Sequence, residues 1–104
     1  MPQIIKTLRV ENKAGFHLRV ASMISKTASG AKSEVTLANG SYRADCKSCL
    51  DLLALMAPRG TALTLEAAGE DAETVAEAIE SMFRTKFGED EYAADSGQNA
   101  SSAS

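Results

Sequence analysis

The single histidine of the chain, His17, stands where a glycine-containing loop is predicted to become a helix. An arginine, Arg19, follows two residues later. A helix start presents backbone N–H groups without intrahelical partners and the positive end of the helix dipole, so it favours an anion. An imidazole beside such a site, with a guanidinium able to add charged donors, suits a phosphoryl group carried on the histidine itself. The same residues also fit a histidine that merely bonds a backbone carbonyl and an arginine that is only solvated.

A second helix start follows at Ser48. The segment Ser48-Cys49-Leu50-Asp51 has the spacing of a capping box, in which the serine accepts from the amide three residues on and the acid reaches back. Ser48 is therefore predicted to be an N-cap.

Two cysteines form a C-x-x-C motif, Cys46-Lys47-Ser48-Cys49, at this junction of strand and helix. A thiolate could be stabilised there, so a small redox module built on Cys46 and Cys49 is one alternative function. The surrounding elements lack the βαβ unit of a thioredoxin-like motif, and alternation places Cys46 toward the core. We therefore expect two reduced, packing cysteines. One histidine and one C-x-x-C provide no second pair of ligands, so we expect no metal and no cofactor.

The remaining chain alternates between strand and helix patterns. A last helix is predicted to open at Gly69-Glu70-Asp71 and to stop at Gly88, with Val75, Ile79, Met82, Phe83 and Phe87 on its inner stripe. Asn39-Gly40 predicts a tight hairpin, and Gly30 is expected to end the first helix with a positive φ. The earlier elements are strands over 4–10, 33–38, 41–46 and 61–67, a helix over 18–29 and a short helix over 50–56.

This order, βαββαβα, predicts an α+β fold. The hairpin makes the second and third strands antiparallel neighbours, and three amphipathic helices need one apolar sheet face to cover. We expect a two-layer open-faced sandwich, with a four-stranded antiparallel sheet covered on one face by three helices. Residues 1–88 form the predicted domain, and residues 89–104 form an acidic, Ser/Ala-rich tail that we expect to be disordered.

The charge distribution narrows the function classes. The formal net charge is −3, but residues 88–104 hold four acidic residues and no basic one, which leaves 11 basic and 10 acidic residues in the predicted domain. Nothing in this near-neutral distribution indicates nucleic acid, and no apolar stretch approaches the roughly 18 residues that a membrane span needs. The N-terminal residues lack the basic and apolar regions of a secretory signal, so we expect a cytoplasmic protein, and we expect a monomer.

Three motifs in this order resemble the HPr family of histidine phosphocarriers, over residues 3 to about 87. They are the run Gly15-Phe16-His17-Leu18-Arg19, the pair Lys47-Ser48, and Gly69-Glu70-Asp71, each at a predicted helix start. The resemblance implies that His17 takes a phosphoryl group on Nδ1 from enzyme I of the phosphoenolpyruvate-dependent sugar phosphotransferase system. It then passes the group to sugar-specific EIIA-type acceptors, with Arg19 stabilising the phosphate. The chain would thus be a carrier rather than an enzyme.

The resemblance also implies a regulatory role for Ser48, as the target of an ATP-dependent HPr kinase/phosphorylase. A regulatory adaptor controlled by that phosphorylation, with sugar transport secondary, is therefore another alternative. For partner binding we expect Arg19, Lys47, Leu50 and Leu53, within an exposed apolar patch beside His17 that Arg43 also rims.

The chain departs from the family pattern at Val20, where a proline normally follows the arginine. Valine restores a backbone N–H in the first turn and loosens the loop, which bears on the rate of transfer. Leu18 is also larger than the small residue usual after the histidine, which bears on the fit of partners.

Overall fold

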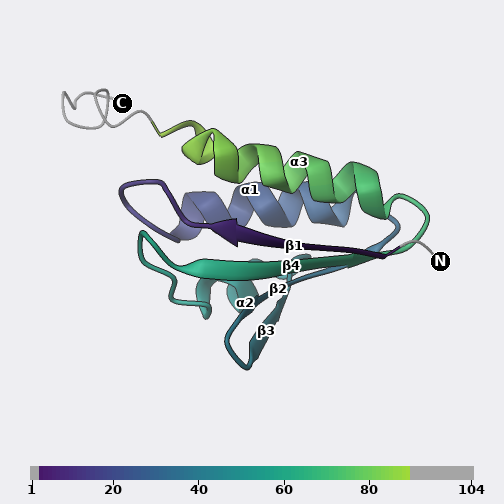
Figure 1. Ribbon diagram of the computed structural model, residues 1–104, viewed down its shortest axis with the longest axis horizontal. Helices are drawn as coiled ribbons and strands as arrows, with labels where there is room; N and C mark the ends of the chain where they lie inside the picture. Colours follow the sequence, from purple (N-terminus) through teal and green to yellow (C-terminus); the bar gives the residue numbers. More distant parts are fainter. Residues whose placement is uncertain (1–2, 90–104) are drawn as a thin grey trace.

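The computed structural model describes residues 3–89 and has the predicted α+β architecture (Figure 1). Its elements follow the predicted order: β1 (Gln3–Arg9), α1 (Leu18–Ser29), β2 (Glu34–Asn39), β3 (Tyr42–Asp45), α2 (Cys49–Leu53), β4 (Ala62–Ala68), α3 (Ala72–Arg84) and the 3₁₀ turn η1 (Lys86–Gly88). The tail prediction for residues 90–104 lies outside the described residues.

The four strands form one antiparallel sheet in the order β1-β4-β2-β3. The central strand β4 places Leu63 opposite Leu8 of β1 and Leu65 opposite Leu37 of β2, so apolar side chains line one face across the sheet. Figure 1 shows α1 and α3 lying together along the sheet, with α2 beside the end formed by β2 and β3. Side chains from all three helices share one core with the apolar sheet face, which confirms the open-faced sandwich.

The opposite sheet face carries a pair of charged side chains. There Arg43 on β3 makes a bidentate ion pair with Glu66 on β4, at 2.8 and 3.1 Å. Arg43 therefore lies on the open face and not at the rim of an apolar patch near His17, because side chains alternate between the faces of a strand.

Two turns differ from the prediction. The hairpin pairs Asn39 with Tyr42, so its two-residue turn is Gly40-Ser41, one residue later than predicted. Gly30 follows α1 with a φ of −80°, not a positive value, because the amides of Gly30 and Ala31 close the helix with hydrogen bonds to the carbonyls three residues back, those of Thr27 and Ala28.

The end of α3 differs most from the sequence pattern. The helix ends at Arg84, before Phe87, and Lys86, Phe87 and Gly88 all have positive φ values of 57°, 56° and 73°. Phe87 is buried as predicted, but from a left-handed turn and not from the helical stripe. The chain is thereby redirected toward the start of α1.

Candidate functional site

His17 is the N-cap residue of α1, as predicted. Its backbone is extended, with φ −149° and ψ −179°, and its carbonyl accepts the first helical hydrogen bond from Ala21 at 2.9 Å. Its side chain is 34% exposed, and no side chain in the described part of the molecule caps the helix. The first-turn amides of α1 thus remain available as donors beside an accessible imidazole.

The loop before His17 is fixed against the segment 57–59. Gly15 has a φ of +71°, and a Cβ there would lie 3.0 Å from the carbonyl oxygen of Ala57 and 3.1 Å from the Cα of Pro58. The amide of Phe16 also donates to that carbonyl, at 2.9 Å. The close approach that glycine permits here is therefore to the protein's own backbone.

An aromatic cluster joins this loop to the C-terminal turn. The ring of Phe16 lies 6.4 Å from that of Phe83 and 6.3 Å from that of Phe87, and the last two are 4.8 Å apart. These are edge or tilted arrangements of the kind aromatic rings prefer. His17, next to Phe16, and Glu89, two residues after Phe87, are consequently held together.

Glu89, 72 residues further along the chain, lies against the histidine. Its Oε2 atom lies 2.8 Å from His17 Nε2 and accepts from Asn12 Nδ2 at 3.1 Å, and its Oε1 accepts from the Ala14 amide at 3.3 Å. The side chain is only 13% exposed. Asn12 is fully buried and also donates to the Gly15 carbonyl at 2.7 Å, so it braces both the loop and the carboxylate.

The surroundings of Glu89 favour its charged form. Partial burial acts to raise the pKa of this carboxyl, as expected for an acid removed from water. Hydrogen bonds from the His17 ring, a backbone amide and Asn12 outweigh that effect, and the pKa lies below its ordinary value. The histidine therefore has an anionic neighbour at neutral pH.

Arg19 joins the same group. Its Nη1 donates to the Phe87 carbonyl at 2.9 Å, and its Nη2 lies 3.5 Å from Glu89 Oε2. The guanidinium and the imidazole thus share one carboxylate oxygen, so the structure brings together the two residues that the sequence singles out. Val20, the departure from the family pattern, is fully buried in the core.

Three large apolar side chains on or just after α1 and α2 are exposed: Leu18 is 64% exposed, Leu50 is 79% exposed, and Met56, which follows α2, is 81% exposed. Leu18 follows His17 directly, and Ser22, one turn later, lies beside Cys49 at the start of α2 with Oγ and Sγ 3.8 Å apart. Leu18 is therefore an exposed apolar side chain next to His17, and the exposed Leu50 directly follows the cysteine that lies beside α1.

The residues predicted to bind partners differ in exposure and in location. Leu50 is exposed, whereas Leu53 is half-buried and packs against the core. Lys47 donates to the carbonyl of Ala31, at the end of α1 away from His17.

Ser48 caps α2 as predicted, because its Oγ accepts from the Asp51 amide at 3.2 Å. The reciprocal half of the capping box is absent in the described region: the Asp51 carboxylate accepts from the Asp45 amide at 3.3 Å instead, and the Ser48 amide donates to the Asp45 carbonyl. Asp51 thus ties the helix to the preceding strand.

Both cysteines are free thiols. Cys46 is fully buried, and that burial raises the pKa of its thiol to about 12, with a smaller contribution from Asp45. This is the opposite of the lowered pKa that makes a cysteine reactive, so the environment of Cys46 argues against the redox alternative.

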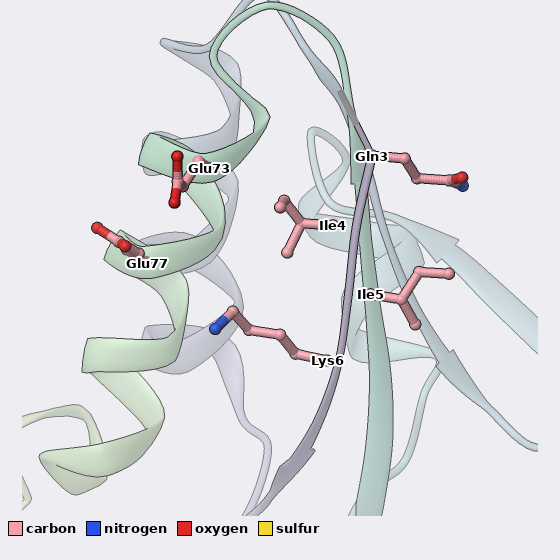
Figure 2. Close-up of a pocket in the computed structure, with 6 residues that line it drawn as sticks. All are labelled: Gln3, Ile4, Ile5, Lys6, Glu73 and Glu77. Carbon is pink, nitrogen blue, oxygen red and sulfur yellow. The ribbon is translucent and has the colours of Figure 1, made fainter. Parts of the chain in front are cut away.

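Other candidate features lie away from His17. A pocket between β1 and α3 is lined by Ile4, Lys6, Glu73 and Glu77, and Figure 2 shows Ile4 and Lys6 pointing toward the helix while Ile5 points away. It lies at the end of β1 opposite the loop that leads to His17. Within residues 3–89, no three His, Cys, Asp or Glu side chains form a metal-binding group. In the same part of the chain, no helix is both long and apolar enough to cross a membrane.

Sequence reasoning missed Glu89 and Asn12 as site residues. The predicted boundary after Gly88 leaves Glu89 with the tail, whereas its carboxylate lies against His17. Glu89 directly follows a glycine and an aromatic residue, but an acidic residue at a composition change carries no sign of a contact 72 positions away.

Comparisons with known proteins identify the family to which the chain belongs. A family described as PTS HPr component phosphorylation site matches residues 4–85. The phosphocarrier protein HPr of Treponema pallidum is 37% identical over 84% of this chain and 99% of its own length, and the phosphocarrier protein NPr of Shewanella violacea is 33% identical over 86% and 98%. A crystal structure of HPr from Thermoanaerobacter tengcongensis has a TM-score of 0.78 at 29% identity, covering 86% of this chain and 99% of that one. The chain belongs to the HPr family of phosphocarrier proteins of the phosphotransferase system.

Proposed function

We propose that His17 is the phosphoryl-carrying residue, and that it takes the group from enzyme I on Nδ1 and passes it to EIIA-type acceptors. The observation that carries this proposal is the accessible imidazole at the uncapped start of α1, next to the Arg19 guanidinium. Its Nε2 faces Glu89, so the other ring nitrogen, Nδ1, is the one left to act as nucleophile.

The transfer needs little from the protein beyond position and charge. The Nδ1 lone pair attacks phosphorus, the new N–P bond forms, and the bond to the donor atom of enzyme I breaks with its electron pair returning to that atom. First-turn amides of α1 and the Arg19 guanidinium stabilise the oxygens of the transferred group. The same steps run in reverse order toward the acceptor, so a partly exposed site suits both the acceptance and the donation of the phosphoryl group.

The phosphate itself tests this proposal. Incubation of the full chain with phosphoenolpyruvate and enzyme I is expected to give an acid-labile phosphate, and His17→Ala is expected to abolish it. Ser48→Ala serves as the control that changes another helix start and keeps the label. Failure of wild-type protein to accept label from several enzymes I, or label persisting in His17→Ala, would contradict the assignment.

We infer that the apolar surface of Leu18, Leu50 and Met56, with Arg19 at its edge, is where these partners dock. Leu18 directly follows His17, Leu50 directly follows the Cys49 that lies beside α1, and exposed apolar side chains of this kind mark protein interaction sites. A charge placed in it should weaken docking, so Leu50→Glu should raise the KM of enzyme I for this protein at least about fivefold.

A matched control exists on the open face of the sheet, where Ile5 is 61% exposed and distant from His17. Ile5→Glu should leave KM within about twofold. Equal effects of the two substitutions would show that docking does not use this surface. We also infer a cytoplasmic monomer, which fractionation and light scattering would test.

A further inference from the structure

The contact between Glu89 and His17 has a chemical consequence that rests on the function proposed above. A carboxylate accepts hydrogen bonds and has no proton to give when ionised. With Glu89 Oε2 at 2.8 Å, the neutral imidazole is favoured in the form that carries its proton on Nε2. Nδ1 then bears the lone pair.

We propose that Glu89 is the positioning residue of this phosphocarrier: it keeps the proton on His17 Nε2 and so presents Nδ1 as the nucleophile. When Nδ1 forms its bond to phosphorus, the ring gains positive charge while the Nε2 proton stays in place. The Glu89 carboxylate lies where it offsets that charge. On donation the N–P bond breaks, its electron pair returns to Nδ1, and the Nε2 proton is again retained.

The carboxylate is built into the site and does not reach it by chance. Four donors converge on it, from the His17 ring, the Asn12 amide, the Ala14 backbone and the Arg19 guanidinium. Charge-assisted bonds of this kind restrict the rotamers of a flexible side chain. The lowered pKa of Glu89 keeps the group ionised at neutral pH.

The backbone that delivers Glu89 is equally specific. Lys86 and Phe87 adopt left-handed conformations, which cost a non-glycine residue about 1–2 kcal/mol each. Burial of the Phe87 ring in the aromatic cluster and the bond from Arg19 to its carbonyl offset that cost. The strained turn places Glu89 against the histidine, whereas a helix continuing through Phe87 would carry it onward along its axis.

A direct test reads the proton on the ring. The chain has one histidine, so the ring ¹⁵N signals of the full-length protein assign without ambiguity. At about pH 8.5, where an ordinary imidazole is neutral, wild-type protein should show a protonated Nε2 and an unprotonated Nδ1. Glu89→Ala should shift the population toward Nδ1–H. Glu89→Gln, which keeps an oxygen acceptor without the charge, should retain much of the Nε2–H form.

Transfer rates supply the second reading. With enzyme I and phosphoenolpyruvate, Glu89→Ala should lower the rate of phosphoryl acceptance about tenfold, as loss of an imidazole's orienting partner typically does. Glu89→Gln should fall between Ala and wild type, because it restores the orientation and not the charge. Glu77→Gln, an exposed glutamate on α3, is the matched control and should leave both readings unchanged.

The outcomes separate this inference from the proposed function. An unchanged ring tautomer and rate in Glu89→Ala would overturn the positioning role, and so would a faster rate, which would mean that the carboxylate competes with the phosphoryl group. The tautomer is measured without any donor, so it stands even if no enzyme I labels the protein. A thermal melt of each variant identifies any loss of folding.

Discussion

The starts of α1 and α2 both have backbone N–H groups without intrahelical partners, but the two helices use these donors in opposite ways. At α2, Ser48 accepts from its own helix and Asp51 ties that turn to the strand before it, so the local donors serve the structure. At α1, His17 makes no such cap, and the residues that hold it come from the loop at Gly15 and from Glu89 at the far end of the domain. A helix start that is positioned from outside can leave its own donors to an incoming phosphoryl group, and one that is capped from within cannot.

The largest loss of stability at the start of α1 is expected from a substitution of Gly15. Gly15→Ala should lower the free energy of unfolding by about 2 kcal/mol, because a Cβ is strained at φ +71° and meets backbone atoms of 57–59. Chemical denaturation measures the change. Gly40→Ala is the matched control, since Gly40 has a φ of +62° with nothing within 4 Å of a Cβ, and it should cost less.

If the two alanine variants lost equal stability, the packing of the loop onto 57–59 would contribute nothing beyond backbone strain. The loop would then not be the rigid support of His17 that the α1 start requires.

The sequence predicted what depends on short-range pattern. Helical spacing identified Val75, Ile79 and Phe83 as inner residues of the last helix, and alternation placed Cys46 toward the core; all four are buried. Ser48 was predictable as a cap because the bond it makes spans three residues.

Contacts between distant segments escaped prediction. The helical stripe extends to Phe87 because the residue type suits it, yet packing of Phe87 against Phe16 and Phe83 favours a left-handed turn instead. The place of Glu89 depends on that turn, so no local pattern could reveal it. The turn Gly40-Ser41 shows the same limit on a smaller scale, because strand pairing set its register.

Cys46, just before α2, should make the stability of the fold depend on pH. Its thiol has a pKa of about 12 in the fold, against an ordinary value of 9.0. As pH rises above 9 the unfolded chain loses this proton while the folded chain keeps it, so stability falls until about pH 12. Between pH 8 and 10 the loss should be on the order of 1 kcal/mol.

Denaturation at several pH values measures this effect, and Cys46→Ala should remove that part of the slope whatever its stability at neutral pH. Cys49→Ala, which changes the half-buried cysteine, is the control. Rapid alkylation of Cys46 at pH 8 in the folded protein would contradict a buried, protonated thiol and would revive the redox reading of the C-x-x-C motif.

The smallest expected changes in stability come from substitutions of the two cap residues themselves. Ser48→Ala should lower the free energy of unfolding by about 1 kcal/mol through loss of the cap, and should leave phosphoryl acceptance within about twofold. His17→Ala should do the reverse: it removes no cap bond, so it should change stability by less than about 0.5 kcal/mol while abolishing transfer. Denaturation and labelling of the same two variants give all four values. A stability loss in His17→Ala as large as that in Ser48→Ala would mean that the histidine with its Glu89 partner helps to hold α1 in place, and the separation of a structural start from a functional one would fail.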